Sequence, residues 1–120
     1  MAIQRILIVD DSPTERFFLA DLLGKNGYDV SMAENGNEAL DKAKQLKPDL
    51  ILMDVVMPGI NGFQATRAIS RDDEIKHIPV IMCTTKNQET DKIWGMRQGA
   101  IEYMVKPIDG AALLQKIRAL

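Results

Sequence analysis

Five short apolar runs, each followed by a stretch with helical spacing, are the feature that most constrains how this chain of 120 residues folds. The runs occupy residues 5–10, 28–33, 49–54, 79–84 and 102–106. Runs that are apolar throughout, rather than alternating with polar residues, are typical of strands covered on both faces in a parallel sheet. Strands that alternate with helices predict an α/β fold, namely a flavodoxin-like (βα)5 doubly wound sandwich with strand order 2-1-3-4-5.

The stretches between the runs carry the start and stop signals of helices. The first helix is expected over residues 13–25, with Ser12 as N-cap, Pro13 in the first turn and Glu15 at the capping-box spacing. Further helices are expected over residues 37–46, 62–70 and 88–98, and Asp109 caps a fifth. The helical pattern that would cover the sheet comprises Phe17, Leu19, Leu22, Leu23, Ala39, Leu40, Ala43, Leu46, Phe63, Thr66, Ile69, Ile93, Met96, Arg97, Leu113, Leu114 and Ile117.

The composition narrows the classes of function. Hydrophobic residues make up 46% and charged residues 27% of the chain, as in soluble globular proteins. The formal net charge of −2 argues against a general nucleic-acid binder. No apolar run approaches the roughly 20 residues of a membrane span, and the N-terminus lacks the features of a signal peptide. With Cys83 as its one cysteine, the chain is expected to be a cytoplasmic protein without membrane insertion, forming one domain over residues 1–120.

Three carboxylates lie where the predicted strands end. Asp10 and Asp11 follow the first run, and Asp54 ends the third. In open parallel sheets, ligands bind beyond the carboxyl ends of the strands where the strand order reverses, which is here between the first and third strands. Three close carboxylates repel one another unless a proton or a cation neutralises them. A site made only of oxygen ligands favours Mg²⁺ or Mn²⁺ over zinc, so the sequence predicts a divalent metal site.

A hydroxyl and an ammonium group are expected at the same edge of the sheet. Thr84 ends the fourth run, with Thr85 as a rival hydroxyl, and Lys106 ends the fifth. A metal and a lysine can neutralise the oxygens of a phosphoryl group while a carboxylate attacks phosphorus. This set therefore predicts that Asp54 becomes an aspartyl phosphate.

Four segments, "ILIVDDS", "DLILMDVVMPGINGF", "PVIMCTT" and "YMVKP", carry a resemblance to a known family. They resemble the signature segments of bacterial response-regulator receiver domains, the phosphoacceptors of two-component signalling, in the right order over the whole chain. The resemblance implies that Asp54 is the phosphorylated residue and that Asp10 and Asp11 hold Mg²⁺. It also implies that the backbone carbonyl of Val56 completes the protein's share of the metal shell.

The same resemblance assigns roles to the later strand ends. Thr84 would be the hydroxyl that moves toward the phosphoryl group, Lys106 its salt-bridge partner, and Tyr103 the aromatic switch. The Lys106–Pro107 peptide bond would be cis. The implied partners are a CheA-like histidine kinase or its phosphotransfer domain, and a downstream motility or signalling protein that binds the face of the fourth helix, fifth strand and fifth helix.

The sequences of loops and surface segments narrow the resemblance further. The segments "DSPTE", "MDVVMPGINGFQATR" and "TTKNQETDKIWGMRQGA" resemble regulators of type IV pilus twitching motility. Because the chain ends shortly after Pro107, we expect a single-domain regulator without an output domain, as in chemotaxis. Whether it signals forward or acts as a phosphate sink for a sister regulator stays open, and we expect a monomer or weak dimer.

Other functions fit the residues less well. A phosphohydrolase with an aspartate nucleophile needs a second aspartate two residues later, where this chain has Val56. A flavodoxin-like electron carrier needs an anion-binding loop after the first strand, where Asp10 and Asp11 would repel a flavin phosphate. A receiver that no longer signals by phosphorylation is a milder alternative, but every site residue is present. We expect no enzymatic activity beyond the protein's own phosphorylation and slow dephosphorylation. Val56 cannot position a water for dephosphorylation, and the effect of Lys86 on the lifetime of the phosphorylated state stays open.

Four features outside the strand ends have ordinary interpretations. Cys83 and most of the seven methionines are expected in the core, and His77 in a solvated loop. Trp94 fits two alternatives, a core position or an exposed anchor for a partner.

Overall fold

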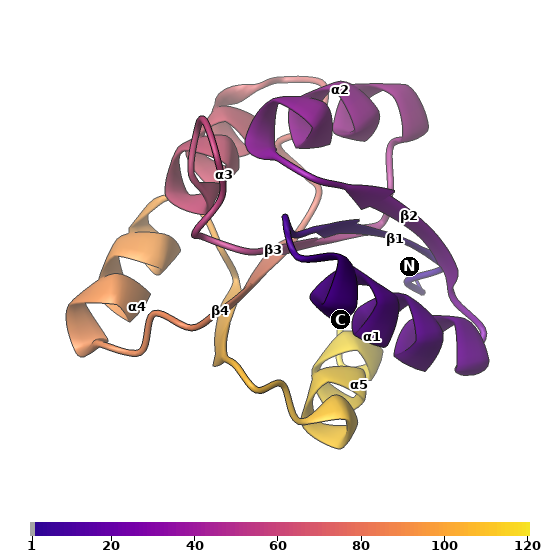
Figure 1. Ribbon diagram of the computed structural model, residues 1–120. Coiled ribbons are helices and arrows are strands. Elements are labelled where there is room, and N and C mark those ends of the chain that lie inside the picture. The colour runs from indigo at the N-terminus through magenta and orange to yellow at the C-terminus, as the bar shows by residue number, and fades with distance from the viewer. Residues whose placement is uncertain (1) are drawn as a thin grey trace.

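The computed structural model describes residues 2–120 as a parallel sheet with helices on both faces (Figure 1). The strands are β1 (Arg5–Val9), β2 (Asp29–Ala33), β3 (Leu50–Met53), β4 (Val80–Thr84) and β5 (Glu102–Val105). The helices are α1 (Pro13–Lys25), α2 (Gly36–Leu46), α3 (Gly62–Arg71), α4 (Glu89–Arg97) and α5 (Gly110–Arg118). The strand order β2-β1-β3-β4-β5 confirms the predicted fold.

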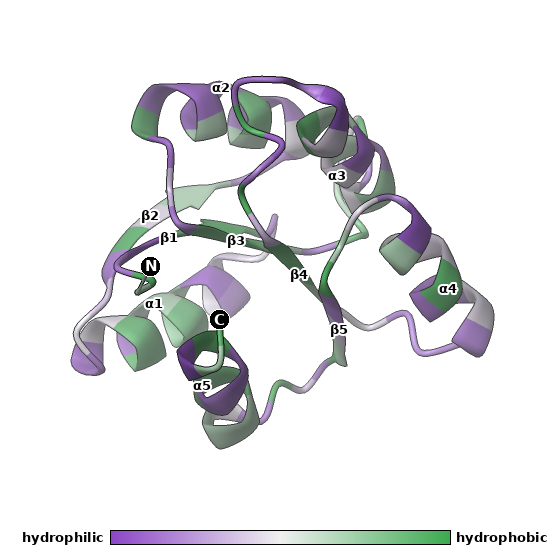
Figure 2. Cartoon of the chain, turned by 180° about the vertical axis from the view of Figure 1, so that it is seen from behind, coloured by the Kyte–Doolittle hydropathy of each residue, from purple (hydrophilic) through white to green (hydrophobic). Residues whose placement is uncertain are grey.

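Two apolar layers form because successive residues of a strand point to opposite faces of the sheet. Ile6 and Ile8 of β1 pack with Leu19, Leu23 and other apolar residues of α1 and α5. Leu7 and Val9 face the other side and pack with residues of α2 and α3. The central strands are accordingly hydrophobic along their length, whereas each helix alternates (Figure 2). Burying one large aliphatic side chain contributes about 1.5–3 kcal/mol, so this sandwich is a stable frame for the strand ends.

A third group of apolar side chains lies beneath α4. It consists of Val55, Phe63, Met82 and Ala100, with the partly buried Tyr103 packed against them. We call these five residues the Val55 cluster.

Ser12 and Asp109 cap α1 and α5, as the sequence predicts. The side chain of Ser12 accepts a hydrogen bond from Glu15 N at 3.3 Å, and that of Asp109 from Ala112 N at 3.2 Å. Asn61 and Gln64 form a full capping box at the start of α3. These bonds satisfy backbone N–H groups that have no partner within the helix.

Several positions expected in the core are exposed instead. Phe17 is 75% exposed because α1 turns Leu19 and Leu23 toward the sheet. Ile93 and Met96 are exposed because α4 buries Gly95 at its contact with the protein, and Leu46 is exposed at the end of α2. Among the methionines, Met53, Met57, Met82 and Met104 are buried, Met32 and Met96 are exposed, and Met1 lies outside the described residues. Within residues 2–120, none of the helices combines the length and apolarity needed to cross a bilayer.

Gly62 brings the first residue of α3 directly against the end of β3. A Cβ atom at Gly62 would lie 2.0 Å from the carbonyl oxygen of Asp54 and 2.8 Å from the Cα of Val55. The Gly62 amide also donates a hydrogen bond to the carbonyl of Val55 at 2.9 Å. Backbone atoms cannot rotate away from a methyl group, so this approach requires glycine and helps to fix the position of Asp54.

We predict that Gly62→Ala lowers the free energy of unfolding by about 1–3 kcal/mol, the usual cost of forcing an extra group into a packed site. Urea unfolding followed by circular dichroism measures the change. Gly24→Ala in α1 is the matched control, because a Cβ there meets nothing within 4 Å. That control should raise the free energy of unfolding by up to about 1 kcal/mol. Equal effects of the two substitutions would contradict the close approach.

Candidate functional site

The ends of β1 and β3 carry two aspartates whose backbones continue the sheet. The Asp54 amide donates to the carbonyl of Val9 at 2.9 Å, and the Asp10 amide donates to the carbonyl of Ala33 at 3.1 Å. These bonds hold both residues in line with their strands although the regular elements end one residue earlier. The strand order therefore brings Asp10 and Asp54 side by side at the point where it reverses.

Asp11 completes an acidic cluster with these two residues. One carboxylate oxygen from each of Asp10, Asp11 and Asp54 can be chosen so that all three lie within 4.8 Å of one another. Asp10 is 2% exposed and Asp54 6% exposed, whereas Asp11 faces solvent. Three oxygen donors at this separation, one of them accessible from outside, suit a hard divalent cation that keeps part of its water shell.

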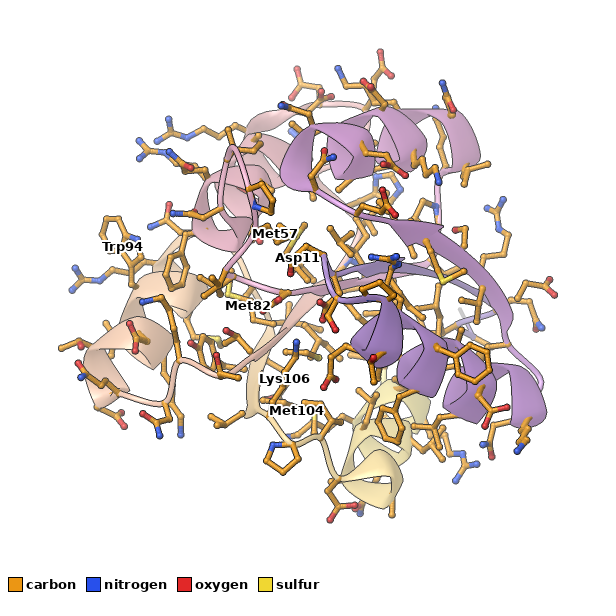
Figure 3. The ribbon with its side chains drawn as sticks, viewed as in Figure 1. Asp11, Met57, Met82, Trp94, Met104 and Lys106 are labelled. Atoms are coloured by element: carbon orange, nitrogen blue, oxygen red, sulfur yellow. The ribbon has the colours of Figure 1, made fainter. Side chains whose placement is uncertain are left out.

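Lys106 contacts the buried part of this cluster. Its Nζ lies 2.7 Å from Oδ2 of Asp10 and 3.5 Å from Oδ2 of Asp54, and its side chain is 9% exposed. Figure 3 shows Lys106 and Asp11 at the same edge of the sheet, near the start of α1. Leaving a buried carboxylate unpaired costs several kcal/mol, and the lysine provides the compensating charge.

The pKa values of the site follow from this balance of burial and charge. Burial, with the neighbouring charge of Asp10, raises the pKa of Asp54 above its ordinary value; Lys106 and the Val55 amide, which donates to Oδ1 at 2.8 Å, act in the opposite direction. Burial by itself would lower the pKa of Lys106, but the hydrogen bond to Asp10 and the charges of Asp54 and Asp10 raise it. Lys106 therefore keeps its proton at neutral pH.

Thr84 and Tyr103 are joined through the backbone of Lys86. The Thr84 hydroxyl oxygen accepts a hydrogen bond from Lys86 N at 3.3 Å, and the Tyr103 hydroxyl donates to the carbonyl of Lys86 at 2.8 Å. Thr84 is fully buried at the end of β4, and its carbonyl accepts from Lys106 N at 2.8 Å. Burial raises the pKa of Tyr103 to about 12, so this phenol stays a neutral donor.

The predicted site residues thus fall into two groups. Asp10, Asp11, Asp54 and Lys106 come together at the strand ends, while Tyr103 sits farther out, tied to the loop after Thr84. The side chain of Val56 points away from the core and is 54% exposed. The Lys106–Pro107 peptide bond is cis, as the family resemblance implies.

Other residues singled out in the sequence lie outside the site. Cys83 is buried in β4, as predicted, and burial raises the pKa of its thiol to about 12. His77 is exposed, also as predicted. Trp94 is 47% exposed on α4, so the core alternative is wrong, and its role as an anchor for a partner stays a prediction.

Two residues around the site were missed in the sequence. Arg16 of α1 donates to the carbonyl of Asp10 at 2.8 Å and pairs with Glu34 at 3.2 Å. The position of Arg16 in the sequence, one helical turn after the N-cap Ser12 and close to the acidic pair, could have indicated this role. Gly62 is the second residue that was missed. A glycine at the first position of a predicted helix could have indicated the close approach.

Comparison with known sequences assigns this chain to one family. The response regulator receiver domain matches residues 6–118, and this chain belongs to that family. It is therefore a receiver domain of two-component signalling, which confirms the resemblance seen in its strand ends.

Individual relatives cover the chain almost completely. Protein PilH of Pseudomonas aeruginosa is 58% identical over 116 residues, which are 97% of this chain and 96% of PilH. The DNA-binding dual master transcriptional regulator RpaA of Synechocystis sp. is 40% identical over 116 residues, but the match covers only 48% of RpaA. The chemotaxis protein CheY4 of Vibrio cholerae has a similar structure, with a TM-score of 0.91, 35% identity and 98% of each chain covered. The chain thus spans nearly all of PilH and CheY4 but about half of RpaA.

We predict that Asp54→Asn stabilises the metal-free protein at neutral pH, by on the order of 1 kcal/mol. The pKa of Asp54 is raised above its ordinary value of 3.8 in the folded chain, so the folded state binds this proton more tightly than the unfolded state. Wild-type stability should therefore fall as the pH rises through the range between those two pKa values, whereas the variant has no such loss.

Urea unfolding in EDTA between about pH 4 and pH 8 measures the difference between the two proteins. It should grow as the pH rises and then level off. Asp41→Asn, an exposed aspartate on α2, is the control and should change little. A variant less stable than wild type at neutral pH would contradict the raised pKa.

Proposed function

We propose that this receiver domain is a phosphoacceptor, in which Asp54 takes a phosphoryl group from a histidine kinase or its phosphotransfer domain. The observation that supports it is the convergence of three carboxylate oxygens within 4.8 Å, with the ammonium of Lys106 at the same point. Because these groups come from β1, β3 and β5, a merely structural ion pair would not need all of them.

The metal in this proposal is Mg²⁺, and Mn²⁺ fits the same donors. Asp10, Asp11 and Asp54 would hold it, with the backbone carbonyl of Val56 as the fourth protein ligand. When bound, the ion supplies positive charge to the phosphoryl oxygens and orients them for in-line transfer.

The reacting atom of the chain is a carboxylate oxygen of Asp54. Oδ1 accepts a hydrogen bond from the Val55 amide at 2.8 Å, whereas Oδ2 has only the longer contact with Lys106 at 3.5 Å, so we assign Oδ2 as the attacking oxygen. One bond forms between this oxygen and phosphorus, while the bond from phosphorus to the donor nitrogen breaks and leaves its electron pair on the imidazole. Lys106 neutralises one phosphoryl oxygen, and the hydroxyl of Thr84 turns toward another.

The output in this proposal is a change of the α4–β5–α5 face, which binds a motility or signalling protein. Tyr103 is the switch residue in this proposal. Its hydroxyl bonds to the carbonyl of Lys86, and the hydroxyl of Thr84 bonds to the amide of the same residue. The likeness to PilH over 97% of this chain supports a regulator of type IV pilus twitching motility, and the likeness to CheY4 supports one of chemotaxis. We propose the cytoplasm as its location and a monomer or weak dimer as its state.

The role of a phosphohydrolase is the weaker candidate. Val56 occupies the position of the required general acid and base, and its side chain is aliphatic and half exposed. An aliphatic side chain at position 56 cannot position a water, which supports slow loss of the phosphoryl group and a protein that does not turn over a substrate. A sink that drains phosphoryl groups from a sister regulator would use the same chemistry.

We predict that a small-molecule phosphodonor such as acetyl phosphate, with Mg²⁺, adds the mass of one phosphoryl group to the intact protein. The adduct should be base-labile, as an acyl phosphate is. Asp54→Asn should abolish it, whereas Asp41→Asn, on the surface of α2, should leave it unchanged. Intact-protein mass spectrometry measures each species. An unmodified wild type under these conditions, or modification of Asp54→Asn, would contradict the proposal.

We predict that the protein binds Mg²⁺ and that Asp11→Asn weakens this binding by about tenfold or more, because one charged ligand is lost. Isothermal titration calorimetry with MgCl₂ gives both affinities. Asp109→Asn, an exposed aspartate that keeps an oxygen to cap α5, is the control and should bind as wild type does. Equal affinities for the wild type and Asp11→Asn would remove Asp11 from the metal site.

A further inference from the structure

Gly95 is the residue through which α4 rests on the protein. It is the buried residue of that helix, and a Cβ atom added to it would lie 2.8 Å from Sδ of Met82. The same atom would lie 3.0 Å from Cδ2 and 3.2 Å from Cε2 of Tyr103. A Cβ atom rarely lies so close to other side chains in a packed interior, so a larger residue at the contact would force Met82, Tyr103 or the helix itself to shift.

The ring that Gly95 touches is held on its other sides. The Tyr103 hydroxyl donates to the carbonyl of Lys86, and the ring packs on the other members of the Val55 cluster. Val55 follows Asp54 directly and donates its amide hydrogen to Oδ1 of that residue. Tyr103 is therefore connected to Asp54 through packed side chains, and to Thr84 through the backbone of Lys86.

We infer that Gly95 is a positioning residue that couples Tyr103 to α4, so that a movement of the ring is passed on as a displacement of the helix. This inference rests on the proposed phosphorylation of Asp54 and names the contact that carries its effect to the α4 surface. Direct contact is what makes the coupling work: a side chain at position 95 would hold the helix off the ring. The ring could then move in the space without moving the helix.

Trp94 makes the coupling measurable. It is the single tryptophan of the chain, it precedes Gly95 in α4, and it is half exposed (Figure 3). Indole emission depends on how much of the ring is in contact with water. A displacement of α4 that alters the contact of this indole with water therefore changes its emission.

A double-mutant cycle tests the contact itself. Alanine is a better helix former than glycine, so Gly95→Ala would raise the urea midpoint if the added methyl group met nothing. We expect it to lower the midpoint in the wild-type chain and to raise it in the Tyr103→Ala chain, where Met82 can move into the space left by the ring. Gly24→Ala, the open position in α1, should raise the midpoint in both chains. A rise of equal size for Gly95→Ala in both chains would overturn the inference.

The emission of Trp94 on addition of acetyl phosphate and Mg²⁺ tests the coupling. We expect a change in the wild type and loss of most of that change in Gly95→Ala, with the same mass increase from phosphorylation in both proteins. Phosphorylation of both with an equal emission change would overturn the inference and leave the proposed function standing. No mass increase in the wild type would instead contradict the proposed function, and the coupling to phosphorylation would fall with it.

Discussion

The contact of Lys106 with Asp10 and Asp54 is the interaction on which the site depends. Two carboxylates that are almost fully buried at neighbouring strand ends repel each other, and both lose the water that would stabilise their charge. The Lys106 ammonium group offsets the repulsion and the lost hydration by pairing with Asp10 at 2.7 Å and with Asp54 at 3.5 Å. The compensation is incomplete, since the pKa of Asp54 stays raised. A further cation beside Asp11 would therefore stabilise the remaining negative charge of the site.

The rest of the fold keeps this strained arrangement in place. Parallel strands put the ends of β1, β3 and β5 at one edge, and hydrogen bonds from the Asp10 and Asp54 amides extend the ladder to these two carboxylates. Gly62 closes α3 onto the backbone of Asp54, and Arg16 holds the carbonyl of Asp10 from the other side. The apolar layers on both faces of the sheet supply the stability that close carboxylates remove, which is the usual trade-off at functional sites.

Much of this could be predicted from the sequence because the physical signals are local. Uninterrupted apolar runs indicate doubly covered strands, and the order of such strands determines which of their ends meet, so Asp10, Asp11 and Asp54 could be grouped before any coordinates were known. The exposure of Phe17 and Ile93 could not, because a helical repeat does not say how wide the buried face is. The pairing of Lys106 with Asp10, 96 residues apart, and the contact of Gly95 with Tyr103 depend on packing between distant segments.

Two physical routes lead from the strand ends toward the surface, one from Thr84 and one from Val55 beside Asp54, and both end at Tyr103. One consists of hydrogen bonds and runs from Thr84 through the peptide groups of Lys86 to the tyrosine hydroxyl. The other consists of packed side chains and runs from Val55 through its cluster to the tyrosine ring. A hydrogen bond alone fixes one atom of a side chain that can still rotate, and packing alone leaves the ring free to slide along its neighbours. Together the hydrogen bond and the packing fix both the position and the orientation of the Tyr103 ring. The ring then moves only when both sets of contacts change. Such a double hold is what the proposed switch role of Tyr103 requires, because a single broken contact at the surface leaves the other route intact.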